Sequence, residues 1–176
     1  MSEDEAIKGT ITGLRSAQLF LYNTYRTKWY MICLRYMANK SDADDALQNG
    51  LLNIFLKITQ FDSRFGTFAA WSSRIIVNDC IMLIRKNQRS LVTTAWSEEA
   101  IIYDEAESTI DILSRKELMG MIRKLPDGYR TVFNMYVIEG YSHKEIAEYL
   151  SISENTSKSQ LFKAKKMLKQ VLEIII

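Results

Sequence analysis

Residues that interrupt helices are scarce in this sequence. It contains one proline and seven glycines among 176 residues, while 47% of its residues are apolar. This composition argues against disorder and supplies enough apolar side chains for packed cores. The length suits one large or two small domains. We therefore expect an ordered, mostly helical chain.

Metal-ligating and nucleophilic residues are also scarce. The single histidine, His143, and the two distant cysteines, Cys33 and Cys80, lack the spacing of a zinc site. Both cysteines lie in partly apolar helical contexts, which favours buried thiols over a disulfide. The sequence shows no pair of catalytic carboxylates, no nucleophile–base pair and no phosphate-binding loop. It thus predicts no catalytic residue, no metal and no cofactor, and we expect a protein that is not an enzyme.

Long hydrophobic runs are absent too. No stretch of 18 or more apolar residues occurs, so the sequence predicts no transmembrane helix. The first ten residues, MSEDEAIKGT, are acidic and polar and do not resemble a signal peptide. We expect a cytoplasmic protein without membrane insertion.

The net charge of +2 conceals three segments of different sign. Residues 1–89 carry 12 Lys/Arg against 8 Asp/Glu, and residues 115–176 carry 11 against 7. Between them, residues 90–114 carry 6 Asp/Glu and no Lys/Arg. The two basic segments suit a polyanionic partner, whereas the acidic segment would be repelled by the same partner.

Hydrophobic periodicity predicts an all-α fold of two small helical domains. In the first domain we expect helices from about 12 to 38, from Ser41 onward, and from about 67 to 86. The third of these helices carries apolar residues at helical spacing, which are expected to be core: Phe68, Trp71, Ile75 and Met82.

The second half of the chain begins with a segment that lacks a steady period. We interpret residues 90–108 as an acidic linker, which places the domains at 1–89 and 109–176. A turn signal at 125–128 precedes a helix that ends at Gly140, as a C-cap glycine would end it.

The segment from Tyr141 to Lys169 has the pattern of a helix-turn-helix. Ser142 and Glu145 fit a capping box, which starts a helix, and residues 151–153 interrupt the pattern. In the next helix, one side is expected to pack in the core: Ser157, Leu161, Ala164 and Leu168. The opposite side is basic and contains Asn155, Lys158, Ser159, Phe162, Lys166 and Lys169. A helix-turn-helix presents its second helix to the DNA major groove in this way.

Phe162 stands in the middle of the basic side, one turn from Lys158 and one turn from Lys166. There it can contact a thymine methyl group or a sugar, and the helix-turn-helix context favours DNA contact. Two alternatives stay open. The basic side is an ordinary solvated face, or Phe162 packs on a neighbouring helix.

A second polar cluster lies on the helix expected over 67–86. Arg74, Asn78 and Arg85 fall within about 40° of each other around the helix axis. Arg85 is followed by Lys86 and Arg89, which make a basic helix end. These residues fit DNA contact, and they fit equally a cationic C-terminus that complements the helix dipole.

Two blocks of the sequence resemble a known family. Residues 42–49 (DADDALQN), 68–71 (FAAW) and 74–78 (RIIVN) are similar to region 2 of the bacterial sigma-70 factors. A second block is similar to region 4, and it consists of residues 125–133 (LPDGYRTVF), 139–142 (EGYS), 145–147 (EIA) and 158–161 (KSQL). A short linker without a middle domain resembles the extracytoplasmic-function (ECF) subgroup.

The resemblance implies a sigma factor that binds core RNA polymerase, directs it to promoter DNA and helps to melt that DNA. By position it implies polymerase contacts from Asp45, Gln48, Asn49 and Phe55. It implies contacts with the −10 element from Phe65, Phe68, Trp71, Arg74, Asn78 and Arg85, with an unpaired base captured by the loop at 61–68. It implies contacts with the −35 element from Asn155, Lys158, Ser159, Phe162, Lys163 and Lys166. For Phe68 and Trp71, the residues themselves favour core packing. An anti-sigma factor is a further partner that the resemblance implies.

Two other functions compete with this interpretation. A helix-turn-helix regulator that does not recruit polymerase would bind duplex DNA alone, at symmetric half-sites. A helical adaptor with basic faces for acidic proteins would show no salt-steep DNA binding. The charge segregation and the region 2 resemblance favour a sigma factor.

Overall fold

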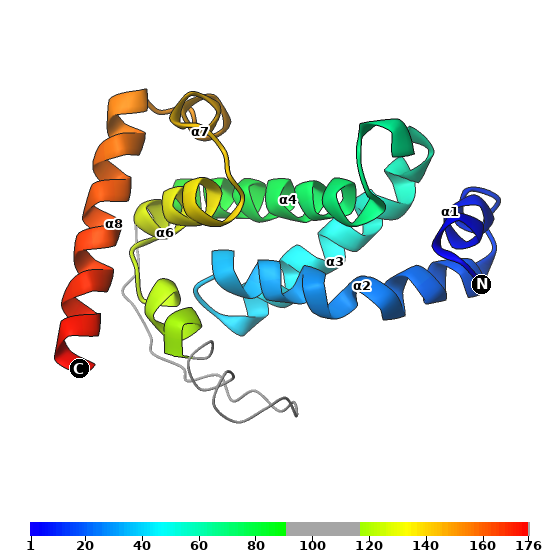
Figure 1. Ribbon diagram of the computed structural model, residues 1–176, viewed down its shortest axis with the longest axis horizontal. Helices are drawn as coiled ribbons and strands as arrows, with labels where there is room; N and C mark the ends of the chain where they lie inside the picture. The colour runs from blue at the N-terminus through cyan, green and yellow to red at the C-terminus, as the bar shows by residue number, and fades with distance from the viewer. Residues whose placement is uncertain (91–116, 176) are drawn as a thin grey trace. The chain divides into compact units, whose positions relative to one another are not determined.

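The computed structural model describes the backbone of residues 1–90 and 117–175, with side chains described for 1–86 and 117–170. Every regular element in these ranges is a helix, which confirms the all-α fold class (Figure 1). Apart from Ser90, the linker predicted at 90–108 lies outside the described residues.

The chain divides into two compact units, as expected for two small domains. The first consists of Met1–Leu34 with Lys40–Leu91, and the second consists of Arg35–Asn39 with Val92–Ile176. The exact domain boundaries stay a prediction.

Long helices joined by short turns build the first unit. They are α1 (Glu3–Ile11), α2 (Arg15–Tyr36), α3 (Lys40–Lys57), the 3₁₀ turns η1 (Ile58–Gln60) and η2 (Ser63–Phe65), and α4 (Phe68–Ser90). The helices predicted near 12–38, 41 and 67–86 are confirmed as α2, α3 and α4. α3 begins at Lys40, one residue before the predicted start at Ser41.

The core of the first unit joins α2, α3 and α4. Its large side chains without exposed surface include Leu21, Trp29, Ile54 and Ile76. Trp29 Nε1 donates a hydrogen bond to Ser72 Oγ at 3.1 Å, which ties α2 to α4. Asn53 Nδ2 donates to Asp79 Oδ1 at 2.8 Å, which ties α3 to α4. Such pairs fix the helix register, because a buried polar group without a partner destabilises the fold.

The helix α1 is missing from the sequence-based prediction, although its signal is present. Ser2 Oγ accepts from the Glu5 N–H at 3.2 Å, and the Glu5 carboxylate accepts from the Ser2 N–H at 2.7 Å, which completes a capping box. Ile7 is buried, and the Tyr25 hydroxyl donates to the Glu3 carboxylate. Burial and the Glu3 carboxylate raise the pKa of Tyr25 to about 12. α1 is thus packed against the unit.

An aromatic cluster supports the loop before α4. The ring centroids of Tyr25, Phe61, Phe68 and Trp71 lie 5.4 to 5.6 Å apart in contacting pairs. Phe68 has no exposed surface, and Trp71 is half-buried. The placement of Phe68 at the DNA surface is therefore wrong. Its ring is enclosed by other aromatic rings, as the core interpretation of this residue expected.

Met82 is not a core residue, contrary to the expectation from helical spacing. Its side chain is 66% exposed. The buried side of α4 instead carries Ile76, Val77, Cys80, Ile81 and Ile84. On the opposite side of α4, Phe61 packs against Phe68 and Trp71. Met82 lies about three helical turns after Trp71, so Phe61 does not cover it.

The close contact between α3 and α4 depends on Gly50, which leads to a stability prediction. A Cβ atom at this position would lie 2.4 Å from Cδ1 of the buried Ile76. We expect Gly50→Ala to lower the free energy of unfolding by about 1–2 kcal/mol, because overpacking outweighs the gain in helix propensity. Urea unfolding followed by circular dichroism measures the change.

Gly120→Ala is the matched control for this substitution. Gly120 is helical, and a Cβ atom there would meet no heavy atom within 4 Å. This variant should be as stable as the natural chain or more stable, by up to about 1 kcal/mol. Equal effects of the two substitutions would contradict a tight contact at Gly50.

The second unit contains a short helical segment at 117–123, followed by α6 (Asp127–Phe133), the π-helical turn η3 (Asn134–Ile138), α7 (His143–Leu150) and α8 (Glu154–Ile175). Its core includes Leu125, Ala164 and Leu168, packed against Met121, Tyr129 and Phe133. Gly140 follows η3 with φ +78°, which confirms its predicted role as a helix-ending glycine.

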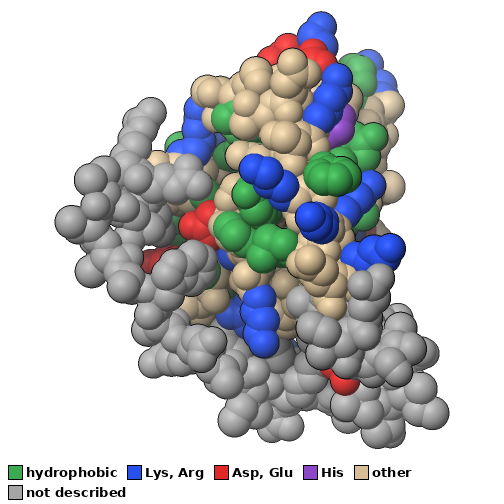
Figure 2. Space-filling model, turned by 90° about the vertical axis from the view of Figure 1, so that its left-hand side faces the viewer, with side chains coloured by type: hydrophobic (Ala, Val, Ile, Leu, Met, Phe, Trp, Pro, Cys, Tyr) green, Lys and Arg blue, Asp and Glu red, His purple; other side chains and the backbone are tan. Residues whose placement is uncertain are grey.

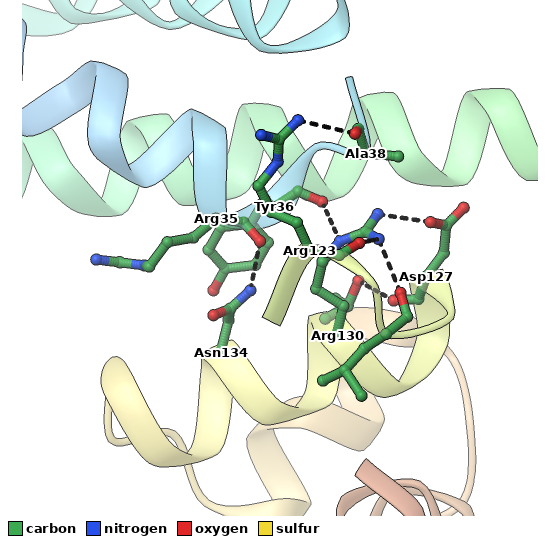
Figure 3. A network of polar contacts seen from close by, with 9 residues as sticks. Arg35, Tyr36, Ala38, Arg123, Asp127, Arg130 and Asn134 are labelled. Carbon is green, nitrogen blue, oxygen red and sulfur yellow. Dashed lines mark hydrogen bonds and ion pairs between the residues drawn. The ribbon is translucent and has the colours of Figure 1, made fainter. Parts of the chain in front are cut away.

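A buried arginine holds the start of α6. Arg130 is 1% exposed and donates from Nε to the Tyr36 carbonyl at 2.9 Å (Figure 3). Its Nη1 donates to the carbonyls of Leu125 at 2.9 Å and Arg123 at 3.2 Å. Its Nη2 lies 2.5 Å from Asp127 Oδ1. The buried charge is stable because a carboxylate and several carbonyl oxygens surround it.

Candidate nucleic-acid interface

The helix-turn-helix is formed by α7 and α8, and capping interactions set the start of each helix. Ser142 Oγ accepts from the Glu145 N–H at 3.2 Å, which confirms the predicted capping box. α7 ends at Leu150, and its C-cap Ser151 has a φ of +56°, in the left-handed region. Ser153 Oγ then accepts from the Thr156 N–H at 3.0 Å at the start of α8.

One side of α8 packs in the unit, and the opposite side is exposed. The predicted core residues Ser157, Leu161, Ala164 and Leu168 are all buried. The exposed side carries residues that we call the α8 face: Asn155, Lys158, Ser159, Phe162, Lys163 and Lys166. Figure 2 shows this side of the molecule, where blue lysine and arginine side chains surround green hydrophobic ones.

Phe162 is 69% exposed, so the alternative in which it packs on a neighbouring helix is wrong. The contacts that the structure shows for the neighbouring lysines Lys158 and Lys163 are weak. Lys158 Nζ lies 3.8 Å from Glu154 Oε2 with both side chains at least half exposed, and such a pair is weak. Lys163 Nζ lies 5.9 Å from the Tyr129 ring centroid. The α8 face thus offers cations and an aromatic ring together.

The single histidine lies where η3, α7 and α8 meet. Its ring stacks on Tyr136 with centroids 4.4 Å apart, and its Nδ1 lies 2.9 Å from Ser157 Oγ. Burial lowers the pKa of His143 below its usual value of 6.5. The positive charges of Lys158 and Lys165 lower it further, while Glu154 opposes them. The folded unit therefore favours the neutral ring more than the unfolded chain does.

This arrangement predicts a pH-dependent stability. The pKa of His143 is lower in the folded than in the unfolded chain, so the unfolded chain binds more protons as pH falls below 6.5. The contribution of His143 is complete above pH 6.5 and is lost as pH falls toward the folded-state pKa. Thermal unfolding at pH 7.5 and pH 5.5 should show a larger drop for the natural chain than for His143→Gln. Equal drops would exclude this histidine as the cause.

The residues predicted for the −10 element divide into exposed and enclosed ones. Phe65 is 88% exposed beside Arg64, while Trp71 is half-buried and Phe68 is core. On α4, Arg74 is exposed, and Asn78 and Arg85 are partly buried. We call Arg74, Asn78, Met82 and Arg85 the α4 face. Met82 was not predicted as a surface residue, because its helical spacing also fits the apolar stripe that was expected to be core.

The residues predicted for polymerase binding lie along one side of α3. Asp45, Gln48 and Asn49 are exposed, and Phe55 is half-buried. Two leucines on this side were missed by the sequence analysis, although their helical spacing with Asn49 is readable. Leu52 is 60% exposed and Leu56 is 68% exposed. We call Asp45, Gln48, Asn49, Leu52 and Leu56 the α3 face.

Other kinds of site are not found in the described ranges. Cys33 and Cys80 are buried thiols that form no disulfide, as predicted. Within residues 1–86 and 117–170, whose side chains are described, no three His, Cys, Asp or Glu side chains are placed to hold a metal ion. None of the helices described is long and apolar enough to cross a membrane.

A helix-turn-helix with an exposed basic face, preceded by a helical unit with a second basic face, defines a DNA-binding transcription protein. Comparison with protein families agrees with this class. The model of Sigma-70 region 2 matches residues 21–90, and the model of Sigma-70, region 4 matches residues 115–168. The chain belongs to the sigma-70 family, in its ECF subgroup. As a sigma factor, it binds core RNA polymerase and directs the initiation of transcription at promoters.

Individual relatives match nearly the whole chain. The ECF RNA polymerase sigma factor SigW of Bacillus subtilis is 27% identical, with 94% of each chain covered. SigM of the same organism is 25% identical, covering 85% of this chain and 91% of its own. Among solved structures, the sigma factor RpoE from Bartonella quintana, in complex with the anti-sigma factor NepR, has a TM-score of 0.59 at 17% identity. That match covers 87% of this chain and 94% of RpoE. CnrH, in complex with the cytosolic domain of CnrY, has a TM-score of 0.51 at 20% identity, with 96% of each chain covered. Both solved structures share the fold of this chain.

Proposed function

We propose that the α8 face binds the −35 element of the promoter. The supporting observation is the combination of exposed Lys158, Lys163 and Lys166 with a 69% exposed Phe162 on the second helix of a helix-turn-helix. Lysines supply salt-dependent contacts with phosphates, and the aromatic ring contacts thymine methyl groups or sugars in the major groove.

The −10 element is bound by the α4 face and by the loop that contains Phe65. An 88% exposed phenylalanine beside Arg64 suits an unstacked base, because bases of melted DNA stack on exposed aromatic rings. The buried ring of Phe68 and the half-buried ring of Phe61 hold this loop in place, while the half-buried Trp71 keeps exposed surface for DNA contact. Phe68 acts as a support in this proposal.

The α3 face binds core polymerase. Leu52 and Leu56 form an exposed apolar centre, and Asp45, Gln48 and Asn49 form a polar rim. This arrangement is typical of a protein–protein interface. Phe55 lies at its edge and packs half inside the unit.

Several broader properties complete the proposal. The domains lie at 1–89 and 109–176, joined by the acidic segment 90–108, which is suited to a basic channel rather than to DNA. The protein acts in the cytoplasm and has no catalytic activity of its own, in keeping with sigma factors as regulators of RNA polymerase. An anti-sigma factor regulates it, since the structural relatives RpoE and CnrH were solved with partner proteins.

Transcription in vitro tests the proposal. Purified core polymerase is combined with the chain and a pool of promoter fragments, and the transcripts identify both promoter elements. Asn78→Ala should reduce promoter opening more than polymerase binding, whereas Leu52→Ala with Leu56→Ala should reduce polymerase binding itself. If the chain alone bound duplex fragments with symmetric half-sites and no transcript appeared, the result would instead support a regulator that does not recruit polymerase.

A further inference from the structure

The helices α8 and α4 each carry an exposed apolar side chain between polar neighbours. On α8, Phe162 is 69% exposed, with a lysine one turn to either side. On α4, Met82 is 66% exposed, with Asn78 one turn before it and Lys86 one turn after it. Isolated exposed apolar residues are common, and Leu19 of α2 is another example at 56% exposed. Phe162 and Met82 differ from it because they lie on the two helices assigned to DNA.

The structure of α4 does not require Met82 for folding. The neighbouring Ile81 and Ile84 are 3% and 7% exposed and supply the core contacts of this part of the helix. Methionine is unbranched and adapts its shape to irregular apolar partners. On the surface of promoter DNA, the apolar group exposed in the major groove is the C5-methyl group of thymine.

The position of Met82 along α4 indicates which part of the DNA it meets. Met82 lies 14 residues after Phe68, which corresponds to about 21 Å along the helix axis. Phe65, the proposed stack for an unpaired base, lies just before the helix begins. At about 3.4 Å per base, 21 Å spans roughly six nucleotides. A DNA strand that follows α4 would therefore place Met82 roughly six nucleotides from that unpaired base.

We propose that Met82 contacts the methyl group of one thymine in the paired DNA at the −10 element, and so selects for that thymine. Asn78 lies about 6 Å away along the axis, which places it one or two base pairs from the same thymine. The inference rests on the proposed function, in which the α4 face lies on promoter DNA.

The test removes each partner of this contact separately. Each thymine at the −10 element is replaced in turn by deoxyuridine, which lacks only the methyl group. Binding of each promoter is then measured with core polymerase carrying the natural chain or Met82→Ala. At one thymine, deoxyuridine should weaken binding about fourfold for the natural chain, the effect of one buried methyl group. With Met82→Ala, the same replacement should have no further effect.

Control variants separate this contact from other causes. Met82→Leu should restore part of the sensitivity to the methyl group. Met31→Ala, at a 38% exposed methionine of α2, should leave that sensitivity unchanged. The inference would be overturned if deoxyuridine at every thymine left binding by the natural chain unchanged. It would also be overturned if deoxyuridine weakened binding by Met82→Ala as much as it weakens binding by the natural chain. Weaker polymerase binding by Met82→Ala in the absence of promoter DNA would also overturn it.

Asn78→Ala distinguishes the inference from the proposed function on which it rests. If Asn78→Ala leaves promoter binding intact, the α4 face is not on DNA and the residue assignment itself fails. If Asn78→Ala weakens promoter binding while Met82 shows no coupling to any methyl group, only the inference about Met82 is wrong.

Discussion

Arg130→Met is expected to lower the free energy of unfolding of the second unit by about 3–5 kcal/mol. Methionine fills similar space, but it leaves the buried carbonyls of Tyr36 and Leu125 without their donor. Each buried acceptor without a partner costs about 1–3 kcal/mol. Asp127 contributes less to the loss, because its side chain is 32% exposed and can turn to water. Urea unfolding measures the change.

Two variants calibrate this expectation. Arg130→Lys keeps the charge but lacks the planar fork that reaches several acceptors, so it should recover only part of the stability. Lys158→Met removes the exposed partner of Glu154 and should change the stability by less than about 0.5 kcal/mol. If Arg130→Met were as stable as Lys158→Met, the polar network around Arg130 would not hold the unit together.

The combined variant Lys158→Ala with Lys163→Ala is expected to weaken binding of the −35 element about tenfold or more. Both side chains are exposed, so their removal should leave the fold intact. Loss of two phosphate contacts should reduce the slope of log affinity against log salt by about 2. Fluorescence anisotropy over a range of salt concentrations measures both quantities, and transcription from the same promoter should fall in parallel.

The matched control keeps the charge at both positions. Lys158→Arg with Lys163→Arg should retain the salt slope, because arginine also binds phosphates. A circular dichroism melt of each variant checks the fold. Unfolding of the alanine variant would show that these lysines are structural and would contradict the assignment of the α8 face. An unchanged salt slope would remove both lysines from the phosphate contacts.

The helix-turn-helix could be predicted from sequence because its signals are local. The Ser142–Glu145 capping box and the apolar positions of α8 are set by neighbours three or four residues away. Periodicity alone then gave the buried side of α8, including Ser157. The resemblance to known sigma factors supplied the family and function.

Tertiary contacts decided the positions that sequence reasoning misplaced. Phe65 and Phe68 look alike in the sequence, yet one is 88% exposed and the other is enclosed by aromatic rings from α2 and the preceding loop. Met82 fits a core stripe by spacing, but its side chain is 66% exposed, while Phe61 packs against Trp71 nearer the start of the helix. The π-helical turn at Asn134–Ile138 has no local pattern that we recognise. α1, by contrast, was readable from its capping box.

The placement of His143 gives this chain a built-in spectroscopic probe. Because the sequence holds one histidine, the imidazole C–H protons of the free protein give a single set of NMR signals. The ring touches Tyr136 and Ser157 between the two helices of the DNA-binding motif. DNA phosphates that neutralise Lys158 would raise the pKa of His143, because the charge of Lys158 lowers that pKa. The titration of His143 would therefore report the binding of promoter DNA. Occupancy of the α8 face can thus be followed on an unlabelled natural side chain.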